Sequence, residues 1–217
     1  MRTASGPARI ETATFPVRWG PFAQGVVERT LLPQLGRVDM FTTISQGRVG
    51  RFDVERYNGR WRGGYPDNDN VSSTGVIPIP AGVPTVLPAP EFVPTTLPYA
   101  KIVAASTGRF PVSDHTSVVE IPAGQTQPVT RPNGPTPGSV ARQGGGGDYL
   151  SKEIAYRATL LRDAVGADIP GGHLHTPVLE FGPGNNTELT DPVFATNQRD
   201  IVDQVRAVLV VAGGTLG

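Results

Sequence analysis

The chain has 217 residues, no cysteine and a formal net charge of zero. The balanced charge gives no electrostatic footprint for nucleic acid or an anionic membrane, and the lack of cysteine excludes disulfides, thiolate metal sites and a cysteine nucleophile. The length suffices for one sizeable domain, and no apolar run approaches the length of a membrane span.

The N-terminal part predicts alternating strands and helices. Residues 8–17 alternate loosely and predict a strand, residues 22–32 have helical spacing that Pro33 disrupts near its end, and residues 38–44 predict a second strand. Strand, helix and strand at this spacing predict a βαβ unit with a parallel pair of strands.

The middle of the chain is rich in turn residues. A short strand is expected over 52–57, and residues 61–70 (WRGGYPDNDN) predict a loop. A helix with Pro98 at its first position is expected over 97–105, followed by one or two short strands within 110–121. We expect one domain over 1–217 with long Pro/Gly-rich loops at about 71–96 and 110–143. Such loops are either lids and binding loops or solvent-facing insertions.

The stretch from Gly144 to Tyr156 (GGGGDYLSKEIAY) carries the strongest chemical signal. Apolar spacing after the glycine run predicts a helix to about residue 166, with Asp148 as its N-cap and Ser151 in its first turn. Glycines let the backbone approach a neighbour closely, and the free N–H groups of a helix N-terminus can stabilise an oxyanion. Ser151 is therefore a candidate nucleophile. The alternative is a capping-turn serine behind a glycine linker.

Two further places combine reactive groups with constrained backbone. Glu55 ends the run DVE, and His173 and His175 lie two residues apart where a strand is expected around Leu174. In a strand the two histidines face the same side, which could form a zinc pair, but no third ligand has convincing spacing, so no metal is expected. Glu55 could instead be a paired surface charge, and His115 is expected to be a solvated loop histidine.

A final helix is expected over 198–211, with apolar residues on one face. The glycine run lacks the spacing of dinucleotide- and phosphate-binding motifs, so no cofactor is expected. Lysine occurs only at Lys101 and Lys152, because the other cationic side chains are arginine, which we interpret as a composition effect.

Four stretches in this order resemble the pyroglutamyl peptidase I (pyrrolidone carboxyl peptidase) family. VER at 54–56 followed by YPDN at 65–68 is similar to the family's VER…IPDN, and TLP at 96–98 is similar to its STLP. Residues 146–156 resemble its AG-x-x-x-C-N-x-x-x-Y, and LHTP at 174–177 resembles its IHVP. Together they extend from about residue 8 to the C-terminal helix, interrupted by the two long loops.

The resemblance implies an α/β, three-layer fold, with a twisted, mostly parallel sheet between helices, and a Glu–Cys–His triad. By motif, Glu55 matches the orienting glutamate, His175 matches the general base, and Ser151 stands where the family has its nucleophilic cysteine. The substrate would be a small peptide or amide with an N-terminal pyroglutamyl or related cyclic acyl group. The substrate and oxyanion positions implied are Gln46, Gly146, Gly147, Tyr149 and Leu150.

The sequence departs from the family in two ways. A hydroxyl replaces the thiol, so the histidine–glutamate pair must act as a stronger base. The family's first strand and its GFEPFGG-like motif have no counterpart, so the chain is expected to be N-terminally truncated within that fold. The alternatives are a fragment of a longer protein, a homo-oligomer that supplies the missing segment, or an inactive homologue that acts as a binding module. The resemblance implies a cytoplasmic location, with secretion of a longer parent protein still open.

Overall fold

The computed structural model describes residues 1–216 and contains a central four-stranded sheet. Its strand order is β3 (Phe41–Gln46), β13 (Gly171–Thr176), β4 (Phe52–Glu55) and β9 (Val112–His115). The β3–β13 and β4–β9 pairs are parallel and the β13–β4 pair is antiparallel. The expected twisted, mostly parallel sheet is confirmed.

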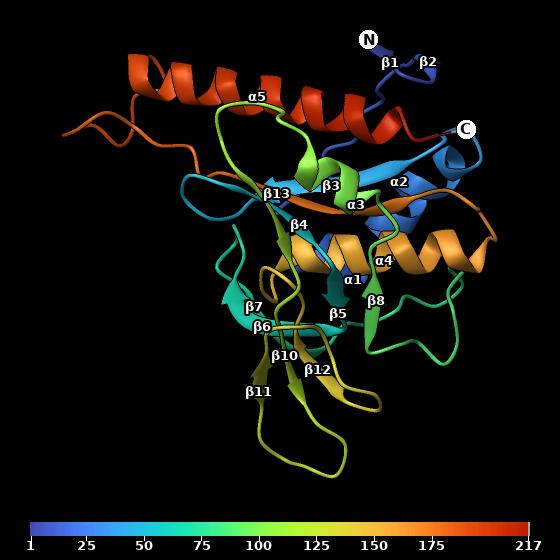
Figure 1. Ribbon diagram of the computed structural model, residues 1–217. Coiled ribbons are helices and arrows are strands. Elements are labelled where there is room, and N and C mark those ends of the chain that lie inside the picture. Colours follow the sequence, from blue (N-terminus) through green and yellow to red (C-terminus); the bar gives the residue numbers. More distant parts are fainter. Residues whose placement is uncertain (217) are drawn as a thin grey trace.

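Helices cover both faces of this sheet (Figure 1). The long helix α5 (Pro192–Gly213) and the short helix α3 (Tyr99–Ala104) lie on one side. On the other side lie α4 (Leu150–Ala164), α2 (Val26–Leu35) and α1 (Trp19–Ala23). This arrangement is the expected three-layer α/β fold.

The alternation along β4 decides which side chains face which helix layer. Phe52 and Val54 are fully buried and pack in one cluster with Ile201 and Val208 of α5. Successive side chains of a strand point to opposite faces. Glu55 therefore points to the α4 side of the sheet, away from α5.

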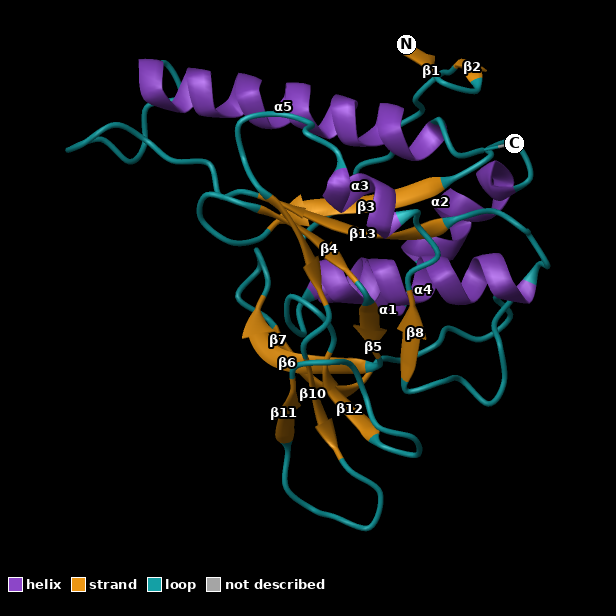
Figure 2. Ribbon diagram, viewed as in Figure 1, coloured by secondary structure: helices purple, strands orange, loops and turns teal. Residues whose placement is uncertain are grey.

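A second group of strands lies beyond α4 (Figure 2). Three antiparallel arrangements make it up: β5–β8, β6–β7 and the three-stranded sheet β11–β10–β12. Their bounds are β5 (Tyr57–Gly59), β6 (Trp61–Pro66), β7 (Ser72–Val76), β8 (Phe92–Pro94), β10 (Val118–Ile121), β11 (Val129–Arg131) and β12 (Val140–Gln143). The prediction of loops at 61–70, 71–96 and 110–143 is therefore wrong in part, because each range contains strands.

A buried ionic network connects α2, α4 and β6. The Arg157 guanidinium, on α4, donates to both carboxylate oxygens of Glu28 on α2 and, at 3.0 Å, to Glu153 Oε1. Arg62 Nε, on β6, donates to Glu153 Oε2 at 2.6 Å. All four side chains are at least nine-tenths buried. The network fixes the orientation of α4, whose first turn faces the central sheet.

The N-terminal expectations need correction. Residues 8–17 form no strand, so the predicted βαβ unit is absent and β3 pairs in parallel with β13 instead. Two short strands, β1 (Arg2–Thr3) and β2 (Gly6–Pro7), form a hairpin near the C-terminal end of α5. No helix within residues 1–216 combines the length and the apolar character needed to cross a membrane.

Helix boundaries also differ from the prediction. The helix expected over 22–32 is two helices separated by Gly25, which has a φ of +82°. Pro33 does not disrupt α2, which continues to Leu35. The last helix starts at Pro192 because the Asp191 side chain accepts a hydrogen bond from Phe194 N and caps it. The helix at 97–105 is confirmed, although Pro98 is its N-cap and not its first residue. The strands within 110–121 and around Leu174 are also confirmed.

Candidate active site

Glu55 is the centre of a buried polar cluster on the α4 side of the sheet. It is the last residue of β4, and its side chain is fully buried. His175 Nδ1, on β13, lies 2.7 Å from Glu55 Oε1, and His115 Nδ1, on β9, lies 2.6 Å from Oε2. The surface-charge alternative for Glu55 is therefore wrong. His115, expected to be a solvated loop residue, is instead a member of the cluster.

The charge on Glu55 fixes how the two histidines are protonated. Burial alone would favour the neutral acid, but the charge of Lys152 and the two histidine hydrogen bonds outweigh it and hold the pKa of Glu55 well below its usual range. An ionised carboxylate only accepts hydrogen bonds, so both Nδ1 atoms carry the donated proton. In the neutral imidazole, Nε2 is then a free base.

The two Nε2 atoms differ in their surroundings. Arg48 Nη2 donates to His115 Nε2 at 3.3 Å. Within residues 1–216, no group hydrogen-bonds to His175 Nε2. His175 is therefore the histidine that is available as a general base, and His115 supports Glu55 from the other side.

The glycine run forms a tight turn against this cluster. Gly144 and Gly147 exchange backbone hydrogen bonds of 3.0 and 3.2 Å. Gly146 has a φ of +76°, and a Cβ atom there would overlap the His175 ring, while a Cβ at Gly145 would overlap the Glu55 carboxylate. The turn can approach the cluster only because these positions lack side chains.

Ser151 lies in the first turn of α4 and is half-buried. The N-cap of this helix is Tyr149 and not Asp148, because the Asp148 side chain is buried and accepts a hydrogen bond from Gln143 Nε2 at 3.1 Å. The amides of Leu150 and Ser151 belong to the helix start and have no intrahelical acceptor. Among the described residues, no hydrogen bond joins Ser151 Oγ to His175.

The side chains of the remaining predicted substrate positions make structural contacts. Tyr149 Oη donates to Pro66 O at 2.9 Å, and Leu150 is buried in an apolar cluster with Trp19. Gln46 is at the end of β3, where its Oε1 accepts from Leu179 N at 3.1 Å. Their side chains therefore hold the surrounding backbone in place.

The hydrogen bonds of His173 are made to β3 and not to the Glu55 carboxylate. It is fully buried, and its ring nitrogens lie 2.7 Å from Thr43 Oγ1 and 3.1 Å from Ser45 Oγ. Burial, then the nearby positive charges, lowers its pKa well below the ordinary value, so the ring stays neutral. In the part of the chain that the structure describes, no three His, Cys, Asp or Glu side chains are grouped to hold a metal ion.

Sequence reasoning missed two members of the cluster. For His115 the sequence predicts only a strand within 110–121, and its pairing with β4, which brings His115 to Glu55, comes from the structure. Lys152 is fully buried, and its Nζ lies 3.3 Å from Asn58 Oδ1 and 3.9 Å from Glu55 Oε2. Its signal was the rarity of lysine in this chain.

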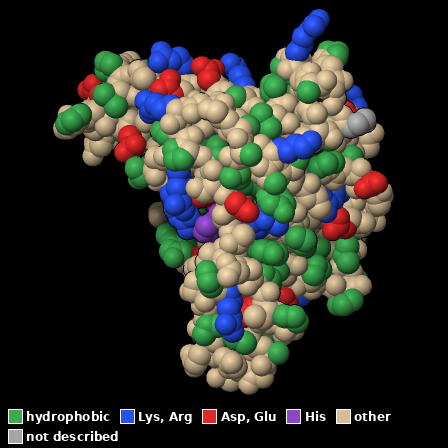
Figure 3. All heavy atoms as spheres, in the orientation of Figure 1, with side chains coloured by type: hydrophobic (Ala, Val, Ile, Leu, Met, Phe, Trp, Pro, Cys, Tyr) green, Lys and Arg blue, Asp and Glu red, His purple; other side chains and the backbone are tan. Residues whose placement is uncertain are grey.

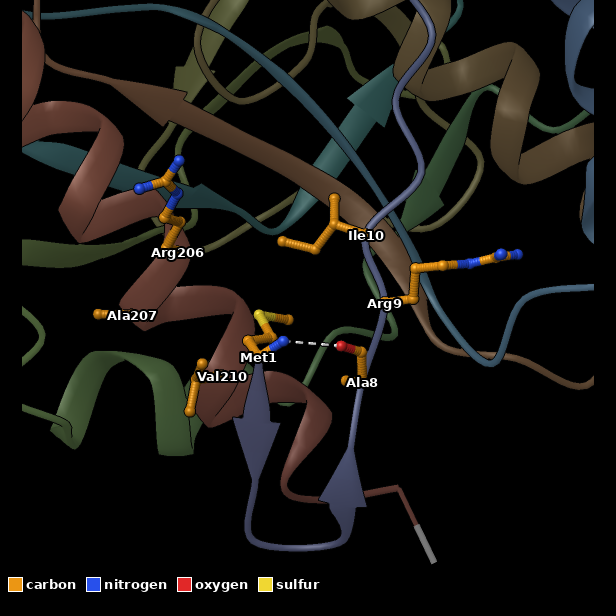
Figure 4. Close-up of a pocket in the computed structure, with 7 residues that line it drawn as sticks. All are labelled: Met1, Ala8, Arg9, Ile10, Arg206, Ala207 and Val210. Carbon is orange, nitrogen blue, oxygen red and sulfur yellow. Dashed lines mark hydrogen bonds between the residues drawn. The ribbon is translucent and has the colours of Figure 1, made fainter.

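In Figure 3 a histidine reaches the surface of the face shown, with Lys or Arg side chains beside it. A hollow of about 420 Å³ lies elsewhere, between the N-terminal segment and α5 (Figure 4). It is lined by Met1, Ala8, Arg9, Ile10, Arg206, Ala207 and Val210. It contains no member of the Glu55 cluster.

The fold is similar to that of solved pyrrolidone carboxyl peptidases. A mutant enzyme from Pyrococcus furiosus superimposes with a TM-score of 0.57 at 20% identity, covering 94% of this chain and 81% of that one. The enzyme from Thermococcus litoralis superimposes with a TM-score of 0.56 at 15% identity, covering 91% and 74%. At this identity the likeness concerns the fold, which is a pyrrolidone carboxyl peptidase-like α/β fold.

The family model described as "PA0049, C-terminal domain" matches residues 2–95 and 99–180. The chain belongs to this family. It is 32% identical to protein PA0049 of Pseudomonas aeruginosa over an alignment of 299 positions, which covers all of this chain and 54% of that protein. The chain thus spans about half the length of that relative.

Proposed function

We propose that this chain hydrolyses the amide bond of an N-terminal pyroglutamyl group or a related small cyclic acyl group. The observation that carries the proposal is the 2.7 Å hydrogen bond from His175 Nδ1 to the buried Glu55, which leaves Nε2 free. Ser151 lies at the nearby start of α4. The substrate class comes from the name of the structural neighbours, the pyrrolidone carboxyl peptidases.

In the proposed mechanism, Ser151 Oγ attacks the acyl carbon while its proton passes to His175 Nε2. Glu55 holds the imidazole in orientation and stabilises the imidazolium. His175 then donates this proton to the leaving amine, which gives an acyl-serine ester. Water attacks the ester with His175 again as base, and the acid and free serine are released.

The start of α4 supplies the groups for the developing oxyanion. The amides of Leu150 and Ser151 lie at the positive end of the helix dipole and have no intrahelical acceptor. One such donor contributes about 100- to 1000-fold in rate. Gly146 lets the adjoining turn lie against His175, since a Cβ atom there would overlap the imidazole, and Gly147 has a φ of +125° that favours glycine.

A second candidate is an inactive homologue that binds a ligand without turnover. The missing hydrogen bond between Ser151 Oγ and His175, among the described residues, favours it, as does a serine whose hydroxyl is far less acidic than a thiol. Catalytic hydrogen bonds are often long or poorly aligned before substrate binds. In the active enzyme the Ser151 side chain would rotate to bond with His175 when substrate binds, and in the inactive homologue it would not.

The test is labelling of the purified chain by a fluorophosphonate, read by peptide mass spectrometry, with hydrolysis of a pyroglutamyl amide measured in parallel. We expect labelling at Ser151 and turnover, both lost in Ser151→Ala and kept in Ser106→Ala, an exposed control serine. Turnover unchanged in Ser151→Ala would overturn the mechanism. Ligand binding without turnover or labelling would establish the binding module.

A further inference from the structure

Lys152 is a buried cation that the family resemblance does not supply, because the matching motif has asparagine at this position. Its side chain has an exposed fraction of 0%, and its Nζ atom lies 3.3 Å from Asn58 Oδ1 and 3.9 Å from Glu55 Oε2. It directly follows Ser151 on the first turn of α4.

Burial of the Lys152 ammonium has a large desolvation free energy, which indicates that the charge itself is needed at this position. Transfer of a charge from water to a protein interior costs several kcal/mol. The positive end of the α4 dipole adds to that cost. Burial therefore lowers the pKa of Lys152 to about 8, although the negative charges of Glu55 and Asp53 act in the opposite direction. At neutral pH the side chain is still mostly an ammonium.

The groups around Lys152 come from several elements. β4 contributes Glu55 and Asp53, and β5 contributes the neutral Asn58. β13 contributes His173 and His175, and His173 is held neutral by burial. His115 of β9 reaches the same Glu55 carboxylate. Two other buried cations that contact α4 residues, Arg62 and Arg157, are paired with Glu153 and Glu28.

The charges of the cluster balance only when Lys152 is present. Asp53 is paired with Arg48 and Arg51 at the end of the sheet. The positive charge of Lys152 therefore neutralises the negative charge of Glu55. If the ammonium were removed, the buried carboxylate would attract a proton onto one of its two histidines. A protonated imidazole cannot accept the serine proton.

We propose that Lys152 is a positioning residue, whose ammonium balances the Glu55 carboxylate so that His175 remains an unprotonated base at neutral pH. The catalytic consequence rests on the proposed function, but the electrostatic relationship does not. Lysine is suited to the position because its compact ammonium needs few acceptors, whereas arginine presents five donors in a planar fork. The chain uses arginine at every other cationic side chain except Lys101.

The first test is Lys152→Met, with Lys101→Met as the matched control on an exposed lysine of α3. The chain has three histidines, so their ring proton signals can be followed individually by NMR across pH. In Lys152→Met we expect His175 or His115 to become protonated at a pH about one unit or more above that of the wild type. The reason is the loss of a unit positive charge beside the Glu55 carboxylate that both histidines contact. Lys101→Met should titrate as the wild type. Unchanged histidine titrations in Lys152→Met would overturn the proposal.

The catalytic consequence has its own readout. The acid side of the kcat/KM profile should move to higher pH by the same amount in Lys152→Met, with activity recovered at alkaline pH. A variant that is merely misfolded would lose activity at all pH values. If the wild type shows no turnover, the proposed function fails while the histidine titrations still decide the role of Lys152.

A second variant, Lys152→Gln, tests the proposal if Lys152→Met does not fold. Lys152→Gln keeps a polar group beside Asn58 but removes the charge, and it should show the same histidine shift. In the wild type itself, the histidine signals should show a second inflection near pH 8, when Lys152 loses its proton. Its absence between pH 7 and 10 would contradict the proposal even if neither variant folds.

Discussion

Glu55 and His175 meet diagonally across two antiparallel strands. The residue directly opposite Glu55 on β13 is His173, and His175 lies opposite Asp53. The Glu55 carboxylate nevertheless accepts the His175 Nδ1 proton at 2.7 Å. His173 bonds to Thr43 and Ser45 on the other neighbouring strand instead. The diagonal contact turns the free Nε2 edge of His175 away from the carboxylate.

The first prediction separates the two histidines that share Glu55. His175→Ala should lower kcat/KM by about 10³-fold or more, because among residues 1–216 it removes the one imidazole whose Nε2 has no hydrogen-bond partner. His115→Ala should lower it by only about tenfold, because Arg48 already occupies the Nε2 of His115. Both variants are measured with the pyroglutamyl amide and with the fluorophosphonate. Equal losses would mean that His115 also transfers protons.

The second prediction concerns the glycine turn. Gly146→Ala places a Cβ within the His175 ring and should abolish fluorophosphonate labelling. Gly124→Ala is the matched control, since Gly124 has nearly the same φ, +75°, but its Cβ would meet nothing within 4 Å. Both changes should cost about 1 kcal/mol of backbone strain. Labelling that survives in Gly146→Ala would show that the turn does not set the position of His175.

The structure brings the predicted pair Glu55 and His175 into contact, while the path of several segments differs from the prediction. Local motifs were enough to single out Glu55, Ser151 and His175, because each lies at an element boundary with a marked composition. His115 was missed because its role depends on the parallel pairing of β4 with β9, and on a contact across 60 positions of sequence. Local periodicity does not predict the register between strands that are so far apart in the sequence.

The fold errors have similar physical causes. Residues 8–17 alternate in polarity, but the segment passes beside α5, where Ile10 is partly exposed, and has no strand to pair with. The β6–β7 hairpin was mistaken for a loop because Gly64 has a φ of +89° and the register shifts between Gly63 and Pro66. Glycines and prolines at such irregularities resemble turn signals.

The third prediction concerns the buried ionic network that holds α4. Arg157→Met should lower the free energy of unfolding by about 3–5 kcal/mol, because it leaves Glu28 buried without its partner. Arg206→Met, whose side chain is 67% exposed, should change it by less than about 0.5 kcal/mol. Denaturant titrations measure both. The double change Arg157→Met with Glu28→Leu should recover much of the loss, and a double variant as unstable as Arg157→Met would contradict this account.

The fourth prediction is a pH dependence of stability caused by Lys152. Its pKa in the folded protein is about 8, whereas the ordinary value is 10.5. Between these values the unfolded chain binds a proton that the folded chain has released, so the free energy of unfolding should rise with pH. The slope should approach about 1.4 kcal/mol per pH unit above pH 8. Below pH 8 both states are protonated and the contribution is constant.

The measurement is the difference in unfolding free energy between the wild type and Lys152→Met, from urea titrations at pH 7 to 9.5. The upper limit avoids the ionisation of tyrosines, because burial raises the pKa of Tyr156 and stability is then lost above about pH 10. The stability of Lys152→Met relative to the wild type should fall as the pH rises from 8 to 9.5, because only the wild type gains stability as Lys152 loses its proton in the folded state. Lys101→Met should follow the wild type throughout. A difference that is constant with pH would mean that Lys152 keeps its ordinary pKa in the folded protein, and that burial does not change its titration.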